Sequence, residues 1–203
     1  TNPVANTPDE ALYLEITFAQ GIPIAIDGEN LNGESLISYL NTLAGQHGVG
    51  RIDHIENRLV GIKSREIYEA PAAIVLHTAH NALETMTLSK EQQRFKERVA
   101  QEYADLVYNG RWFSQYRENL QAFVESCQRW VSGTIRVKLH KGTCTVVGRK
   151  ASHSLYSHGL ATYEEGDQFD HTAATGFIHL YGLPLRTQSR VQGLSSGLEF
   201  NSE

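Results

Sequence analysis

The chain has 203 residues, of which 40% are hydrophobic and 20% charged, which is typical of a folded protein and argues against a largely disordered one. Its formal net charge of −5 argues against a nucleic-acid partner, because such proteins usually carry a basic excess. No apolar run is long enough for a membrane span, and two cysteines are too few for a disulfide framework, so we expect a cytoplasmic protein without a membrane partner.

The first half of the chain mixes strand and helix patterns. Residues 1–9, rich in Pro, Asn and Thr, indicate a flexible lead-in or the end of a linker. Apolar and polar residues alternate over 12–18 and 22–26, which predicts a hairpin of half-buried strands. Asn32 then suits the N-cap of an amphipathic helix that stops at Gly48.

Helix signals dominate the middle of the chain. Residues 49–69 fit neither period cleanly and are best interpreted as short strands joined by turns. Pro71 suits the first turn of a helix. Ser89 and Gln92 match a capping box at the start of a long helix, and Ser114 can cap another.

The last third returns to strands. Residues 134–140 and 143–148 predict a second hairpin, 170–182 a short helix, and 187–203 a mobile tail or arm. Strands and helices do not alternate regularly. We therefore expect an α+β fold, with a mixed or antiparallel sheet of hairpins packed by three long amphipathic helices.

Several short motifs have ordinary structural explanations. The G-x-S-x-G at 193–197 lacks the preceding strand and a later His that a hydrolase needs, so a Gly/Ser linker explains it. His77 and His80 could share a helix face, but no third ligand has a recognisable spacing, and we expect no metal site. Cys127 and Cys144 lack neighbouring cations at a helix N-terminus and are best interpreted as core residues.

Nucleotide- and base-binding signals are weak. The sequence contains neither G-x-x-x-x-G-K-[ST] nor G-x-G-x-x-G, the two common Gly-rich phosphate loops. Trp112, Phe113 and Trp130 could form a stacking surface, but the acidic balance favours aromatics that pack between helices.

The segment 50–71 has the most informative composition. It gathers both signs of charge among glycines and short apolar pairs. Among its polar residues are Glu56, Asn57, Arg58, Lys63, Ser64, Arg65, Glu66, Tyr68 and Glu69. Such a set suits a zwitterionic or multiply charged small ligand, whose ammonium pairs with a carboxylate. The alternative is a solvated loop with surface ion pairs, which composition alone favours.

Residues 49–71, VGRIDHIENRLVGIKSREIYEAP, resemble the signature stretch of the argininosuccinate synthases. Similar stretches follow in the family's order at 104–114 (ADLVYNGRWFS), 148–150, 154–157 and 174–178. The resemblance covers only the carboxy-terminal half of that family. The amino-terminal half, an ATP-pyrophosphatase-type nucleotide-binding domain with a Gly-rich phosphate loop, has no counterpart here.

The resemblance implies a function and two site residues. The family activates citrulline with ATP, releases pyrophosphate, and lets aspartate displace AMP to give argininosuccinate. Glu56 and Tyr68 match its citrulline-binding Glu and Tyr; the carboxylate would accept hydrogen bonds from the α-ammonium and the hydroxyl would fix the orientation. We assign no catalytic residue, because ATP with its Mg and the other ligands of citrulline and aspartate belong to the missing half.

The organisation expected from this resemblance has three parts. Residues 1–9 are a linker end, 10–184 the argininosuccinate synthase carboxy-terminal domain, and 185–203 an arm or tail that departs most from the family. The expected partners are citrulline, aspartate, the chain's own nucleotide-binding domain and further copies in a tetramer. The isolated chain is expected to be inactive.

The role of three cations, and the choice between an enzyme half and a stand-alone module, each have two explanations. Arg58, Lys63 and Arg65 could meet an anionic group, but they have no matched role, and surface or interdomain salt bridges explain them as well. A stand-alone oligomeric binding or scaffold module, which keeps the fold without the catalysis, is the alternative to an enzyme half.

Overall fold

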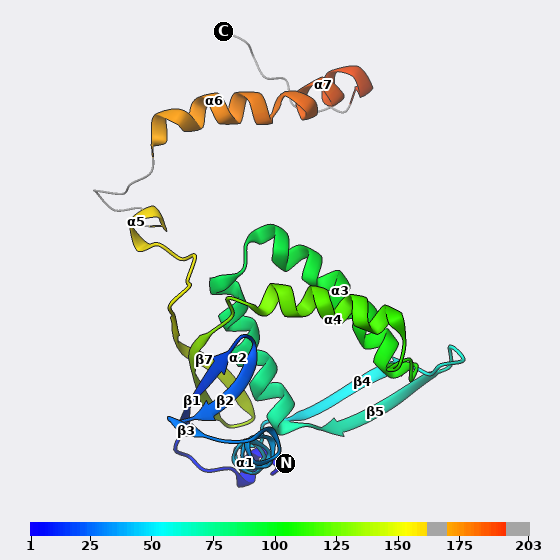
Figure 1. Cartoon of the computed structure of the whole chain (residues 1–203), viewed down its shortest axis with the longest axis vertical. Helices are drawn as coiled ribbons and strands as arrows, with labels where there is room; N and C mark the ends of the chain where they lie inside the picture. Colours follow the sequence, from blue (N-terminus) through cyan, green and yellow to red (C-terminus); the bar gives the residue numbers. More distant parts are fainter. Residues whose placement is uncertain (162–169, 194–203) are drawn as a thin grey trace. The chain divides into compact units, whose positions relative to one another are not determined.

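The structure of the chain, a computed structural model, describes residues 1–161 and 170–193. Its contacts divide the chain into two compact units, Thr1–Tyr156 and Ser157–Glu203 (Figure 1). The first unit holds the strands and four helices of 14 to 19 residues, and the described part of the second unit is helical. The predicted α+β class is confirmed.

A five-stranded antiparallel sheet of order β3-β2-β1-β6-β7 forms the centre of the first unit. Its strands are β1 (Leu12–Ala19), β2 (Ile22–Ile26), β3 (Glu29–Asn30), β6 (Gly133–His140) and β7 (Thr143–Ala151). Both predicted hairpins are present, and they join because β1 pairs with β6 from Leu12 opposite Leu139 to Phe18 opposite Gly133. Alternate residues of β1 and β6 are buried, as their period of two predicts.

Two helices, α1 (Gly33–Gln46) and α2 (Pro71–Thr87), pack against this sheet. The predicted cap is present, because the Asn32 side chain accepts a hydrogen bond from the Ser35 amide at 2.8 Å. The largest side chains of the shared core are fully buried: Leu14, Ile16, Leu36, Leu40, Leu83, Ile135 and Leu139. Withdrawing their apolar surface from water is the main stabilisation of this unit.

The next two helices, α3 (Lys90–Tyr108) and α4 (Gln115–Gln128), pack on each other around a separate small core. Both predicted caps are confirmed: Ser89 and Gln92 form the capping box of α3, and Ser114 caps α4. This core consists of Val99, Leu106 and Leu120, with Tyr103, Phe123 and Val124 packed against it.

The prediction that Trp112, Phe113 and Trp130 pack between helices is wrong for Phe113 and Trp130 and holds in part for Trp112. Phe113 is fully exposed, and the two tryptophans are about half exposed. The reason is their position, because all three lie in the turns that follow α3 and α4 rather than on a buried helix face. The Trp112 ring lies edge-on to Tyr103 of α3, with the ring centres 6.4 Å apart, and the guanidinium carbon of Arg117 on α4 lies 5.2 Å from its centre.

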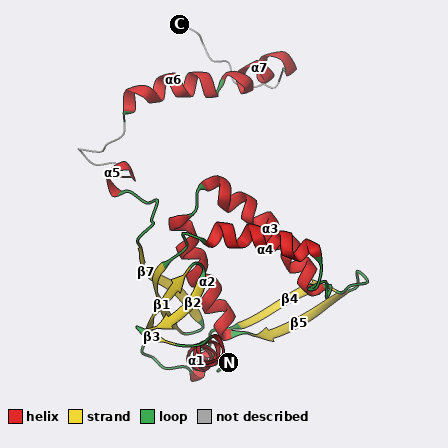
Figure 2. Ribbon diagram, viewed as in Figure 1, coloured by secondary structure: helices red, strands yellow, loops and turns green. Residues whose placement is uncertain are grey.

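The segment expected as short strands with turns is one two-stranded ribbon, β4 (Arg51–Asn57) and β5 (Lys63–Glu69), separate from the main sheet. Figure 2 shows it projecting from the start of α2, with the end of α3 close to its far end. There the Tyr108 hydroxyl donates a hydrogen bond to the Asn57 carbonyl oxygen at 3.2 Å. We call β4 and β5 together the ribbon.

The flexible lead-in expected at residues 1–9 is instead packed against α1. The Asn2 amide donates to the Gly45 carbonyl at 2.8 Å, a 3-10 turn forms at Val4–Asn6, and Thr7 is buried. These backbone bonds fix a segment whose composition alone indicates disorder.

The second unit holds α5 (His158–Ala161), α6 (His171–Tyr181) and α7 (Leu183–Gln192). The short helix predicted at 170–182 is α6. Residues 187–192, part of the expected mobile tail or arm, are helical, because a proline in the first turn and the left-handed Gly193 at the end define α7. The rest of that tail, including the G-x-S-x-G after its first glycine, lies outside the described residues.

No helix within the described ranges is both long and apolar enough to cross a bilayer.

Candidate functional site

The ribbon carries both residues expected to bind the ligand. It is a hairpin because its turn closes on itself: the Arg58 amide donates to the Ile62 carbonyl at 2.8 Å, and Gly61 takes a positive φ of 83°. Pairing places Glu56 opposite Ser64 and Ile52 opposite Tyr68, so Glu56 and Tyr68 share one face.

Glu56 and Tyr68 meet on that face. The Tyr68 hydroxyl donates a hydrogen bond to Oε2 of Glu56 at 3.1 Å. The hydrogen bond to this carboxylate raises the pKa of Tyr68, so the phenol stays a neutral donor at physiological pH. Oε1 of Glu56 receives no hydrogen bond from any described residue and is available to a ligand. The Glu56 side chain is only 19% exposed, whereas Tyr68 is 44% exposed.

Arg58 lies on the same face but is already paired. Its Nη2 lies 2.7 Å from Oε1 of Glu66, and its Nε donates to the Ser64 hydroxyl at 3.0 Å. A guanidinium held in this way neutralises Glu66 rather than offering a free site to an anionic group. Of the two explanations left open for Arg58, the structure therefore shows a surface ion pair within the ribbon.

Arg65 and Lys63 lie on the opposite face of the ribbon. Arg65 binds Asp53 through two hydrogen bonds of 2.9 and 2.6 Å, and this pairing lowers the pKa of the Asp53 carboxyl. Lys63 pairs in register with Asn57 and forms no ion pair within the described part of the chain. The structure therefore separates these two cations from the face that carries Glu56 and Tyr68.

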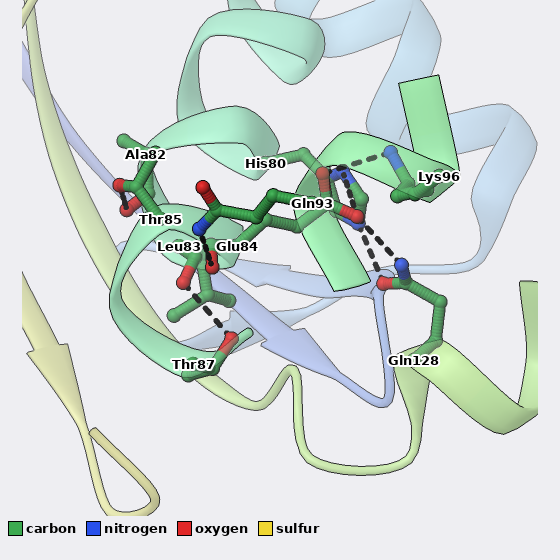
Figure 3. Close-up of polar contacts among 9 residues, drawn as sticks. All are labelled: His80, Ala82, Leu83, Glu84, Thr85, Thr87, Gln93, Lys96 and Gln128. Atoms are coloured by element: carbon green, nitrogen blue, oxygen red, sulfur yellow. Dashed lines mark hydrogen bonds and ion pairs between the residues drawn. The ribbon is translucent and has the colours of Figure 1, made fainter. Parts of the chain in front are cut away.

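Sequence reasoning missed a second polar cluster, at the junction of α2, α3 and α4 (Figure 3). Glu84, which is 6% exposed, accepts hydrogen bonds from Lys96 at 2.8 Å and from Gln128 at 2.6 Å. His80 donates from Nε2 to the Gln128 carbonyl oxygen at 2.9 Å. Only the i,i+4 spacing of His80 and Glu84 was a readable signal, because the other partners lie 12 and 44 residues from Glu84.

A cavity of about 730 Å³ adjoins this cluster. Its lining includes Gln20, Ile22, His77, Asn81 and Tyr103. Burial lowers the pKa of His80, so this imidazole is neutral beside the Glu84–Lys96 pair. With every charge compensated, the cluster is organised as a structural joint between helices rather than as reactive chemistry.

Metal and thiol chemistry find little support in the geometry. No cluster of three or more His, Cys, Asp or Glu side chains suited to a metal occurs in 1–161 or 170–193. Cys127 is buried on α4 and Cys144 partly buried on β7, as their pattern indicates. Burial raises the pKa of both thiols, which makes each a poor nucleophile.

Comparison with known proteins agrees with the resemblance of the ribbon sequence. The family model described as "Arginosuccinate synthase C-terminal domain" matches residues 1–188. That match includes residues 1–9 and extends into α7.

Curated relatives carry the name argininosuccinate synthase. A protein of Dehalococcoides mccartyi is 60% identical over 192 residues, which are 95% of this chain and 47% of the relative. Proteins of Gloeobacter violaceus and Brevibacillus brevis are 55% and 56% identical, over 95% and 94% of this chain and 48% and 46% of their own lengths. The chain thus spans about half the length of these relatives, and it belongs to the argininosuccinate synthase family as the carboxy-terminal domain.

Proposed function

We propose that this chain is the citrulline-holding half of an argininosuccinate synthase, a ligase of arginine biosynthesis. The complete reaction joins citrulline and aspartate, with ATP converted to AMP and pyrophosphate. The observation that carries the proposal is the pair formed by Glu56 and Tyr68, in which one carboxylate oxygen accepts a hydrogen bond from the hydroxyl and the other has no partner in 1–161 or 170–193.

In this proposal the ribbon binds the amino-acid end of citrulline and takes no part in proton transfer. The Glu56 carboxylate accepts charge-assisted hydrogen bonds from the α-ammonium, while Tyr68 fixes the carboxylate and the ligand beside it. The held substrate then directs its ureido oxygen to the α-phosphorus of ATP.

ATP with its Mg belongs to the other half of the enzyme in this account. The ribbon face offers one exposed cation, Arg58, and it is committed to Glu66. Phosphates need several free donors, such as a Gly-rich loop or a helix N-terminus supplies. We therefore expect the isolated chain to be inactive, and aspartate also to be bound outside it.

The proposal includes a cytoplasmic homotetramer. Helices α6 and α7 support assembly, because they expose many large apolar side chains. These are Phe177, Ile178, Leu180, Tyr181, Leu183, Leu185 and Val191.

The test uses a joined enzyme, in which this chain follows the amino-terminal half of the Dehalococcoides mccartyi relative. We expect the joined enzyme to release pyrophosphate only with citrulline and ATP present, and the 203-residue chain alone to show no ATP–pyrophosphate exchange. ATP–pyrophosphate exchange by the isolated chain would refute the proposal that ATP is bound by the other half of the enzyme. A joined enzyme that folds but makes no argininosuccinate would instead favour the stand-alone scaffold module.

A further inference from the structure

We propose that His54 is a third residue of the citrulline site, a positioning residue that holds the carboxylate of Glu56 and the ring of Tyr68 in their binding geometry. The inference rests on the proposed function and adds a residue that the resemblance to the family leaves without a role.

The register of the ribbon puts His54 between the other two residues. The pair His54–Glu66 is the rung between Ile52–Tyr68 and Glu56–Ser64, and all three rungs direct these side chains to one face. His54 therefore lies along the line that connects Tyr68 to Glu56.

The side-chain contacts match this placement. Nε2 of His54 lies 3.7 Å from Oε2 of Glu56, the same oxygen that accepts the Tyr68 hydrogen bond. The imidazole and the phenol ring lie with their centres 5.5 Å apart at an angle of 57°. Oε2 of Glu56 thus accepts one hydrogen bond, from Tyr68, and has the His54 imidazole beside it at 3.7 Å, while Oε1 has no hydrogen-bond partner among the described residues and can meet the ligand's ammonium.

The neighbouring charges direct His54 to Glu56. The other carboxylate that faces it across the ribbon, Glu66, is engaged by Arg58 at 2.7 Å. Tyr68 is the third group beside the imidazole, and it is a neutral donor. Glu56 is therefore the one carboxylate on this face of the ribbon that has no guanidinium partner among the described residues.

The expected effect is on citrulline binding and not on chemistry. A carboxylate already restrained at one oxygen loses less conformational freedom when it binds an ammonium, so the ligand binds more tightly. Loss of the imidazole should raise the citrulline KM about three- to tenfold, the scale of one modest polar contact. The kcat and the KM for ATP should stay unchanged, because neither depends on how Glu56 is held.

The experiment measures steady-state kinetics of the joined enzyme with His54→Ala, His54→Gln and Ile55→Ala. We expect His54→Ala to raise the citrulline KM selectively, and His54→Gln to restore most of the loss because its amide is polar and long enough to lie beside the Glu56 carboxylate. Ile55→Ala is the matched control, since Ile55 is the exposed neighbour on the opposite face; it should leave all constants unchanged.

Glu56→Gln distinguishes a failure of the proposed function from a failure of the role given to His54. If Glu56→Gln raises the citrulline KM but His54→Ala does not, the inference is overturned and the proposed function stands. If neither variant changes it, both fail. A His54→Ala enzyme with all constants altered together, or one not rescued by Gln, shows a merely structural role and also overturns the inference.

Discussion

At the scale of single residues, the site depends on one hydrogen bond that has a close match elsewhere in the chain. Tyr68 donates to Glu56 at 3.1 Å, and Tyr116 donates to Glu102 at the same distance. Both tyrosines are about half exposed, and both have a raised pKa for the same reason. The two pairs therefore have the same hydrogen-bond length and lie in different parts of the chain.

This match gives a controlled prediction. Tyr68→Phe removes the donor that holds Glu56 and should raise the citrulline KM of the joined enzyme about three- to tenfold. Tyr116→Phe removes an equivalent bond far along the chain from the ribbon and should leave that KM unchanged. Equal effects of the two substitutions would show that Tyr68 has no special part in binding.

Gly50 is the residue whose conformation places the ribbon at the start of α2. Its φ is +123°, and a Cβ there would lie 2.5 to 2.7 Å from Pro71 atoms. Gly50→Ala should therefore lower the free energy of unfolding by more than about 2 kcal/mol, through backbone strain and overpacking together. Denaturant unfolding of the 203-residue chain measures this.

The control for that substitution is Gly61→Ala in the turn of the ribbon. Gly61 also has a positive φ, of 83°, but a Cβ would meet no heavy atom within 4 Å. It should lose only about 1 kcal/mol, from the backbone term alone. If Gly50→Ala costs no more than Gly61→Ala, the close approach to Pro71 is not what requires glycine.

At the scale of elements, the α3–α4 pair is joined to α2 by polar contacts more than by a shared core. Its own small core is separate from that of the sheet, and the joint consists of Glu84, Lys96, Gln128 and His80. The turn between β1 and β2 lies close to this joint, because a Cβ on Gly21 would lie 2.2 Å from the Gln128 side chain.

The joint makes stability depend on pH. Burial holds the pKa of His80 below its ordinary value of 6.5, so the unfolded chain binds more protons at that position than the folded chain just below pH 6.5. The contribution of His80 to the free energy of unfolding is fully present above pH 6.5. It decreases as the pH falls toward the pKa that His80 has in the folded chain. His80→Gln should flatten the loss of unfolding free energy over this range.

His77→Gln is the control for this prediction, because His77 is exposed on the same helix and its charge is only a minor cause of the lowered pKa of His80, so this variant should keep most of the pH dependence. Part of the dependence of the unfolding free energy on pH should remain in His80→Gln, since burial also lowers the pKa of His47. Identical pH profiles of the wild type and His80→Gln would contradict the role given to the joint.

At the scale of the whole molecule, local signals predicted most of the first unit. The caps at Asn32, Ser89 and Ser114 and the two hairpins were readable because each depends on residues close together in sequence. The Glu84 joint was not readable, because its partners come from three helices. The sequence also did not reveal that Arg58 and Arg65 lie on opposite faces of the ribbon, because this depends on the exact register of its strands.

The two candidate site residues come from the resemblance to a family and stay a prediction, whereas their geometry could not be predicted from the sequence. Composition alone left a solvated loop as the better explanation of 50–71, and the resemblance to a family selected Glu56 and Tyr68. The structure adds that they touch, that one oxygen is free, and that His54 lies between them. These facts depend on the pairing of two strands, which the ambiguous periodicity of 49–69 did not reveal.

The most direct test of the account is the citrulline KM of the joined enzyme with Glu56→Gln. Losing the charged partner of the α-ammonium should weaken citrulline binding by about 1–3 kcal/mol, while the KM for ATP stays unchanged. Glu69→Gln, an exposed carboxylate on the opposite face of the ribbon, is the control and should have no effect. An unaltered citrulline KM in Glu56→Gln would contradict the claim that this chain holds citrulline through Glu56.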